Sequence, residues 1–142
     1  MKAFFQENDN NKVIVGLPIL CCDTLIYHEN KLIGKAHSSE EAFYMLKELS
    51  NRSHFVYTGF SLFFKGKEYS GFDMAKVTFK KLKENSILDY LKTKEWEGAA
   101  GSYRIQGSAK AFIDTIEGDI TTVIGLPLKV IFDIIENAVN NR

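Results

Sequence analysis

Hydrophobic and polar positions change their spacing along the chain, and the changes predict a mixture of strands and helices. After a polar start at residues 1–12, which we interpret as a loose end, residues 19–27 form a nearly continuous apolar run. Such a run is typical of a strand that is buried on both faces. Residues 38–52 instead place apolar side chains at every third or fourth position, and Ser38 with Glu41 matches an S-x-x-E capping box. We therefore expect a helix there.

The rest of the chain continues this mixture. The expected elements are a short strand or loop at 31–35, strands at 55–64 and 72–79, a helix at 84–94 capped near Asn85 or Ser86, a Gly- and Ala-rich passage at 97–112, a strand at 121–124, and a last helix after Pro127. The polar segment KGKEYSG predicts a long hairpin loop. The Gly- and Ala-rich passage has few large apolar residues, so we expect it to lie outside the core. The last helix is expected to bury Leu128, Ile131, Phe132, Ile135 and Val139.

Strands and helices that follow one another without strict alternation indicate an α/β or α+β class with a mixed sheet. The length of 142 residues and the absence of internal repeats predict a single domain over residues 1–142. A domain of this size buries roughly 68% of the surface of its unfolded chain, which is enough for its own core.

Charge and cysteine content narrow the function classes. Lys and Arg total 18, as do Asp and Glu, so we expect no nucleic-acid partner, because such binding needs an excess of clustered basic residues. No apolar stretch approaches the roughly 20 residues that span a bilayer, and the N-terminus lacks the pattern of a signal peptide. Cys21 and Cys22 are adjacent and have no other cysteine to pair with, which favours small core residues in a reducing compartment. We therefore expect a cytoplasmic protein.

Four residues are candidates for chemistry. Asp23 lies within the apolar run, where it either caps a turn at a strand end or faces a cleft to hold Mg²⁺ or to take a proton from water. In a regular strand, Thr24 points to the face opposite that of its neighbour Asp23. Asp23 and Thr24 can therefore serve one site only near a strand end. Lys35 is either a solvated loop lysine or a phosphate ligand near a helix N-terminus. Gln106, among glycines, belongs either to an ordinary loop or to a site that recognises a base edge.

The three histidines and the aromatic residues suggest no separate chemistry. His28, His37 and His54 have no cysteine or carboxylate partner at a telling spacing, so we interpret them as surface or structural residues. Trp96 and the phenylalanines are most simply explained as core residues.

Four passages occur together in the chain order of the Maf family, and the resemblance covers about residues 17–135. They are CDTLIYHENKLIGKA, EEAFYMLKELSNRSHFVYTG, LDYLKTKEWEGAAGSYRIQG and FIDTIEGDITTVIGLPL. Maf proteins are cytoplasmic nucleoside triphosphate pyrophosphatases linked to septum formation and related in fold to the inosine triphosphate pyrophosphatases. The resemblance implies a twisted mixed sheet flanked by helices. It also implies hydrolysis of a nucleoside triphosphate to the monophosphate and pyrophosphate with Mg²⁺ or another divalent cation.

The resemblance also implies roles for the four candidates. Asp23 and Thr24 match the family's G-A-D-T strand motif, whose Asp is catalytic and is a candidate metal ligand. Lys35 matches the lysine of G-K-P and is expected to hold the triphosphate. Gln106 matches the glutamine of K-A-G-x-Y-x-I-Q-G, which marks the subgroup preferring dTTP and UTP over 7-methyl-GTP. Thr24 is expected to help Gln106 select the base.

The sequence departs from the family pattern at several positions. Cys21 and Cys22 replace the small pair before Asp23, Ala36 replaces the proline, and Ala99 replaces the lysine that usually opens the glutamine loop. The family's first strand, helix and phosphate-gripping S-x-S-P-R-R loop have no counterpart, so we interpret the chain as N-terminally truncated. An unpaired sheet edge then favours association as a homodimer. The alternatives to an enzyme are a non-catalytic nucleotide-binding or cell-division regulatory protein and an inactive fragment.

Overall fold

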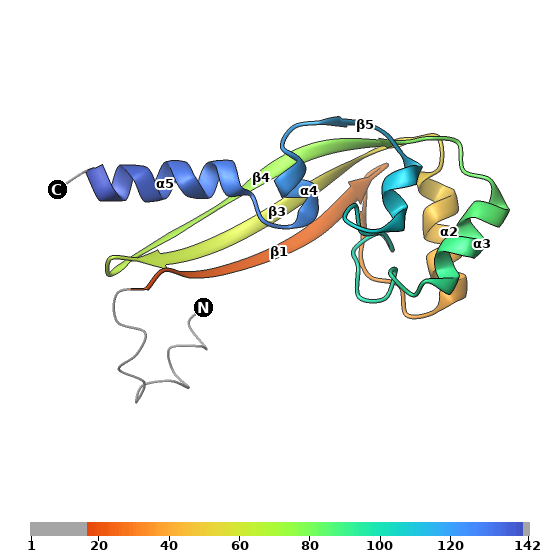
Figure 1. The fold of residues 1–142 in the computed structure, drawn as a ribbon, viewed down its shortest axis with the longest axis horizontal. Coiled ribbons are helices and arrows are strands. Elements are labelled where there is room, and N and C mark those ends of the chain that lie inside the picture. The colour runs from red at the N-terminus through yellow and green to blue at the C-terminus, as the bar shows by residue number, and fades with distance from the viewer. Residues whose placement is uncertain (1–16, 141–142) are drawn as a thin grey trace.

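The computed structural model describes residues 17–140, and the expected loose end at residues 1–12 lies outside this part. The elements are β1 (Ile19–His28), β2 (Lys31–Ile33), α2 (Ser39–Leu49), β3 (Ser53–Phe64), β4 (Lys67–Phe79), α3 (Glu84–Lys92), the 3₁₀ helix η2 (Ser108–Phe112), β5 (Ile113–Glu117), α4 (Ile120–Ile124) and α5 (Leu128–Asn140). The strands form one sheet in the order β2-β1-β3-β4-β5 (Figure 1). The expected α/β class with helices beside a sheet is confirmed. All four strand pairings within residues 17–140 are antiparallel, however, so a mixed sheet was the wrong expectation for this part.

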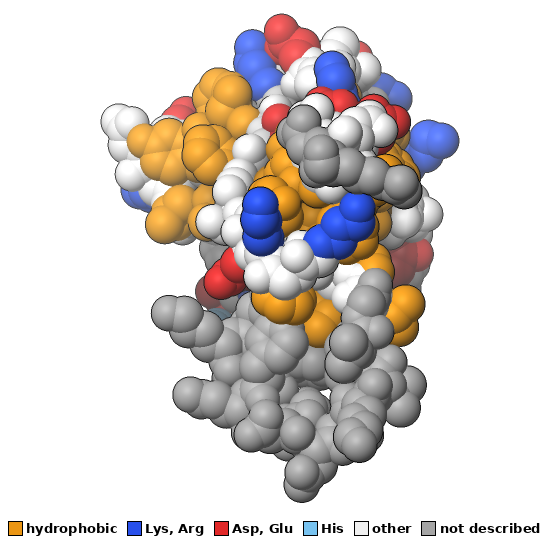
Figure 2. Space-filling view, turned by 90° about the vertical axis from the view of Figure 1, so that its left-hand side faces the viewer, with side chains coloured by type: hydrophobic (Ala, Val, Ile, Leu, Met, Phe, Trp, Pro, Cys, Tyr) orange, Lys and Arg blue, Asp and Glu red, His pale blue; other side chains and the backbone are white. Residues whose placement is uncertain are grey.

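Three long strands give the molecule an elongated shape. At one end of β1, β3 and β4 the helices α2, α3 and η2 pack together, and at the other end the β3–β4 hairpin lies alongside α5 (Figure 1). The larger hydrophobic core lies at the end that holds α2 and α3 and includes Leu46, Val77 and Phe79. A smaller core joins Phe60 and Leu62 of β3 to Ile131 of α5. Figure 2 looks onto the hairpin and α5 end, where hydrophobic side chains gather between charged ones.

The capping box is confirmed at the first predicted helix. The side chain of Ser38 accepts a hydrogen bond from the Glu41 amide at 3.1 Å, as a capping serine does. The Glu41 carboxylate accepts from the His37 amide at 2.7 Å, one residue before the position that the ideal box uses. The next helix, α3, begins after Lys83 without a side-chain cap, so capping by Asn85 or Ser86 was wrong.

The predicted long hairpin loop was also wrong. β3 and β4 pair up to Phe64 and Lys67, leaving only Lys65 and Gly66 in the turn. Both turn residues have positive φ values, 49° and 74°, as a two-residue turn of type I′ requires. The polar letters that suggested a loop belong to the first half of β4, which is largely exposed.

Residues 121–124 form a helix rather than the predicted strand, although all four of them are β-branched. Asp119 caps α4 by accepting hydrogen bonds from the amide and hydroxyl of Thr121 at 2.8 Å. Gly125 ends the helix with a φ of 103°, which glycine adopts without strain. These two end signals override the strand preference of the residues between them, and the strand lies at β5 instead.

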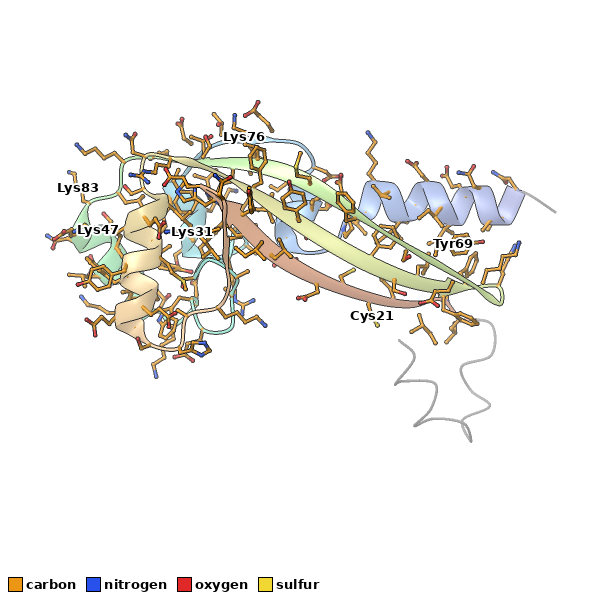
Figure 3. All side chains as sticks on the ribbon, turned by 180° about the vertical axis from the view of Figure 1, so that it is seen from behind. Cys21, Lys31, Lys47, Tyr69, Lys76 and Lys83 are labelled. Carbon is orange, nitrogen blue, oxygen red and sulfur yellow. The ribbon has the colours of Figure 1, made fainter. Side chains whose placement is uncertain are left out.

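The boundary of the core differs from the prediction in four places. The Gly- and Ala-rich passage contributes buried side chains at Tyr103, Ile105 and Phe112, since it folds back onto the larger core. In α5, Phe132 and Val139 are exposed instead of buried. Cys21 and Cys22 are exposed as well, and Figure 3 shows Cys21 on the long stretch of β1. Phe72, 67% exposed, is another exception to the expectation that the phenylalanines form the core.

No helix within residues 17–140 has the length and apolar character needed to cross a bilayer.

Candidate functional site

One pocket brings together all four residues that the sequence singled out. Asp23, Thr24, Lys35 and Gln106 line a half-open pocket of about 270 Å³ between β1, α4 and the loop of residues 98–106. The volume lies near the lower end of the roughly 300–1,000 Å³ that is common for small-molecule sites. Residues up to 83 positions apart in the sequence therefore meet at one surface.

Asp23 reaches this pocket from the middle of a strand. It is the fifth residue of β1 and is exposed, so it neither ends a strand nor sits between two buried faces as expected. β3 pairs with β1 at Asp23, whereas β2 pairs only with residues 26–28, so within residues 17–140 the outer edge of β1 is open here. The Asp23 Oδ1 atom accepts a hydrogen bond from the Thr24 amide at 3.0 Å. An open strand edge, rather than a strand end, lets Asp23 and Thr24 line the same pocket.

A chain of hydroxyl groups links Thr24 to the strands beneath it. The Thr58 hydroxyl donates to the Thr122 carbonyl at 2.7 Å, so its one hydrogen is used there. The 2.8 Å contact between the Thr24 and Thr58 hydroxyls must then run from Thr24 to Thr58. The Thr122 hydroxyl continues the chain to the Asp73 carboxylate at 2.5 Å. This chain joins β1, β3, α4 and β4 and holds Thr24 with its oxygen lone pairs as the available acceptor.

Backbone pairing positions Lys35 at the pocket. Lys35 forms an isolated antiparallel bridge with Ala100, and the Gly101 amide donates to the Gly34 carbonyl at 2.8 Å. Gly101 has a φ of 63°, and a Cβ atom there would overlap the Cδ1 atom of Ile26. The loop therefore needs glycine at this position to pack against Ile26 of β1 while it pairs with the segment that holds Lys35.

Glu95 braces the loop that carries Gln106. Its two carboxylate oxygens accept from the amide and the hydroxyl of Ser108 at 2.8 and 2.6 Å. Its carbonyl accepts from Arg104 Nε at 3.1 Å, and the Glu97 carbonyl accepts from Arg104 Nη2 at 2.9 Å. Arg104 thus spends two of its five N–H donors on the loop and leaves its positive charge beside the pocket.

A buried aromatic pair supports the pocket from below. Tyr103, which lines the pocket, makes a 2.7 Å hydrogen bond between its hydroxyl and Nε2 of His54. Burial, together with the nearby His28, lowers the pKa of His54 from 6.5 to about 4, and burial raises the pKa of Tyr103. Both groups are therefore neutral at physiological pH and act as structural supports, as expected for His54.

Cys22 also lines the pocket, although we expected a core residue there. Burial, and the adjacent Cys21, raise the pKa of the Cys22 thiol. A raised pKa keeps the thiol protonated and poorly nucleophilic at neutral pH. Cys22 therefore contributes shape to the pocket wall rather than a reactive group.

Sequence reasoning missed three residues that hold the site together. Thr58, Thr122 and Glu95 become relevant only when distant strands and loops are brought into register, because each acts through a long-range hydrogen bond. Asp119 just before Thr121 was a local signal for α4 that could have been found, since aspartate is a preferred N-cap residue.

The donor set at the pocket fits a divalent cation that is shared with a phosphate substrate. Asp23 is the one carboxylate that lines the pocket within residues 17–140, and its Oδ2 atom has no hydrogen-bond partner there. Mg²⁺ is usually bound through one or two carboxylates together with substrate phosphates and water. One carboxylate is therefore enough for a cation that arrives with a triphosphate, and too little for an ion held by the protein alone.

Comparison with known proteins places the chain among relatives. The family described as Maf-like protein matches residues 1–138. The chain belongs to the Maf family. The match extends across the β1 strand with Asp23 and Thr24, the loop with Gln106 and most of α5, so the Maf family assignment covers the whole pocket.

Several relatives share the name dTTP/UTP pyrophosphatase. The one from Pyrococcus abyssi (strain GE5 / Orsay) is 42% identical over 118 residues, which cover 83% of this chain and 63% of the relative. The one from Thermoanaerobacter sp. (strain X514) is 39% identical over 127 residues, 87% of this chain and 66% of the relative. The one from Bacillus cereus (strain B4264) is 37% identical over 122 residues, 86% of this chain and 61% of the relative. The chain thus spans less than two thirds of the length of these relatives.

Proposed function

We propose that this Maf-like chain is a nucleoside triphosphate pyrophosphatase that converts dTTP and UTP to the monophosphate and pyrophosphate. One observation carries the proposal: a carboxylate, a lysine and a glutamine from three separate segments line one pocket. The relatives named dTTP/UTP pyrophosphatase support the choice of substrate.

Each pocket residue has a role that its chemistry suits. The Asp23 carboxylate accepts a hydrogen bond from the attacking water and orients it, with Oδ2 as the available oxygen. Lys35 and the charge of Arg104 attract and hold the negative triphosphate. Gln106 offers one donor and one acceptor to the edge of a pyrimidine, and Thr24 offers an acceptor.

The proposal includes a divalent cation, with Mg²⁺ as the natural choice for a triphosphate substrate. Asp23 is the residue that would hold it, together with oxygens of the substrate. When bound, such an ion offsets negative charge on the phosphate oxygens. Lys35 remains at the pocket as a second source of positive charge.

The test is pyrophosphate release by the purified chain with Mg²⁺ across dTTP, UTP, CTP, ATP, GTP and 7-methyl-GTP. We expect turnover confined to dTTP and UTP. Asp23→Asn should lower turnover by about 10²–10⁴-fold, because the water loses its acceptor, while unfolding is unchanged. Asp114→Asn is the matched control, since Asp114 is an exposed aspartate of β5 on the opposite edge of the sheet. Near-normal turnover by the Asp23 variant would overturn its assigned role.

Base selection is tested separately at Gln106. Gln106→Ala removes the donor and acceptor, so we expect KM for dTTP and UTP to rise about tenfold while the discrimination against purine nucleotides weakens. An unchanged substrate profile would show that other residues select the base.

A second candidate function, nucleotide binding without turnover, is favoured by Ala99. This residue is buried in the pocket wall at the position where the family pattern has lysine. Calorimetric binding of dTTP without pyrophosphate release would support this candidate and refute catalysis by the chain. Ala99→Lys, which restores the missing charge, should then strengthen binding.

We further propose a homodimer and a cytoplasmic location. Among the residues that the structure describes, the edge of β1 near Asp23 is unpaired, and such an edge offers backbone groups to a second copy. Two exposed free cysteines suit a reducing compartment. Light scattering coupled to gel filtration tests the dimer, and a monomer at micromolar concentration would exclude it.

A further inference from the structure

A second cluster of chemically active groups lies away from the pocket, at the end of β1 that leads into β2. It consists of His28 at the end of β1, Glu29 in the β1–β2 turn and Glu48 near the end of α2. One ligand atom from each of the three residues lies within 4.8 Å of the other two. Lys31 and Lys47, labelled in Figure 3, mark this end of the sheet, where β2 begins and α2 ends.

The burial and hydrogen bonding of the His28 side chain are those of a typical metal-binding histidine. Its side chain is only 2% exposed, and Nδ1 lies 3.0 Å from the Ser53 carbonyl oxygen. A carbonyl accepts and never donates, so Nδ1 carries a proton, and Nε2 is the ring nitrogen that can bind a metal. A hydrogen bond from one ring nitrogen to a backbone carbonyl is the usual support for a histidine whose other nitrogen binds metal.

The Nε2 atom of His28 has no hydrogen-bond partner within residues 17–140, although it is buried. It faces Oε1 of Glu29 at 3.8 Å, which is too long for a hydrogen bond. Two ligands of a tetrahedral ion with 2.0 Å bonds lie about 3.3 Å apart, so a small inward movement of Glu29 closes the geometry. A buried polar atom that aims at two carboxylates without bonding to either is costly unless something binds between them.

The two carboxylates are placed to move toward such an ion. Glu29 and Glu48 are both exposed, so their side chains can adjust. Arg52 Nη1 donates to Glu29 Oε1 at 2.9 Å, which keeps that carboxylate beside His28 while its oxygens retain lone pairs for a ligand. The backbone of Glu29 is held in a tight turn with a φ of 45°.

We propose that His28, Glu29 and Glu48 form a binding site for a divalent transition-metal ion of the Zn²⁺ type. Imidazole nitrogen is a preferred ligand of Zn²⁺ and related ions and a poor one for Mg²⁺, which selects oxygen. Three protein ligands leave a fourth tetrahedral position for water. Asp23 lies five residues along β1 from His28, about 17 Å away, so the site is separate from the nucleotide pocket.

The test is calorimetric titration of the nucleotide-free chain with Zn²⁺ slightly above neutral pH. Cys21 and Cys22 are replaced by serine throughout, because exposed thiols bind zinc. The decisive variant is Glu48→Gln, since Glu48 is exposed and we expect the variant to keep the fold. The matched control is Glu40→Gln, an exposed glutamate in the first turn of the same helix. His28→Gln is the second variant, with folding checked by circular dichroism.

We expect one zinc ion per chain, an affinity at least about tenfold weaker in Glu48→Gln, and no change in Glu40→Gln. In the chain with both cysteines replaced and no other substitution, zinc should also shift the ring nitrogen signals of His28 in NMR spectra. Equal affinity in Glu48→Gln and Glu40→Gln would overturn the proposal. Displacement of the zinc by an equal concentration of Mg²⁺ would overturn the choice of a transition metal. No nucleotide enters these measurements, so their failure is distinct from a failure of the proposed pyrophosphatase activity.

Discussion

His54 should make the stability of the protein depend on pH below neutrality. Its side chain is 1% exposed, packs edge-to-face on Phe79 and bonds to the Tyr103 hydroxyl. The fold lowers its pKa from 6.5 to about 4, first through burial and then through the nearby His28. Between these two pH values, His54 is therefore protonated in the unfolded chain and neutral in the folded chain.

The sign and size of the effect follow from this difference. The contribution of neutral, buried His54 to the free energy of unfolding is complete above pH 6.5. It is lost as the pH falls toward 4, because protons bind to the unfolded chain and favour that state. At about 1.4 kcal/mol per pKa unit, the gap corresponds to about 3 kcal/mol. That is a large share of the roughly 5–15 kcal/mol by which small domains are stable.

The assay is urea unfolding at several pH values between 7 and 4, for the unsubstituted chain and for His54→Gln. The variant is less stable at pH 7, but it lacks the titrating group, so the difference between the two chains should shrink by about 3 kcal/mol at pH 4. Carboxylates that titrate in this range affect both chains equally and cancel. His37→Gln, at an exposed histidine, is the control and should follow the unsubstituted chain. Parallel curves for the unsubstituted chain and His54→Gln across the whole range would refute the reasoning.

Two further substitutions test the supports of the pocket. Gly101→Ala should lower the free energy of unfolding by about 1–3 kcal/mol in urea titrations, because its Cβ overlaps Ile26 and its φ is positive. Gly34→Ala has open space around the added atom and should change stability by less than about 1 kcal/mol; equal losses would show that the close approach does not matter. Thr58→Val keeps the shape of the side chain but removes the donor to the Thr122 carbonyl, so we expect a loss of about 1–3 kcal/mol. Full stability of that variant in thermal unfolding would show that the hydroxyl chain contributes nothing.

The parts of the site that could be predicted from sequence are those that carry local signals. Asp23, Lys35 and Gln106 each stand out against their neighbours by chemical type or by the order of the passages around them. The structure places all three on one pocket, although their catalytic and binding roles stay predictions. The helix after Ser38 was predictable for the same reason, since its cap and its apolar spacing lie within one segment.

The remaining features depend on register and packing, which no local pattern encodes. The hydroxyl chain through Thr58 exists because the register of β1 on β3 and the packing of α4 bring Thr24, Thr58 and Thr122 within hydrogen-bond distance. Similarly, the Gly- and Ala-rich passage became core because it folds back on the sheet, where Tyr103 meets His54. The hairpin was mispredicted because the first half of β4 is exposed and therefore polar, like a loop.

The two separate hydrophobic cores have a consequence for how the molecule opens. α5 is held to the sheet through the small core around Phe60, Leu62 and Ile131, whereas the pocket rests on the larger core at the other end. Local unfolding follows such divisions, and units with few buried contacts open at lower free energy than the rest. The amide hydrogens of α5 and of the adjoining hairpin end should therefore exchange with solvent sooner than those of α2. The chain can thus lose order at its far end while the nucleotide pocket stays assembled.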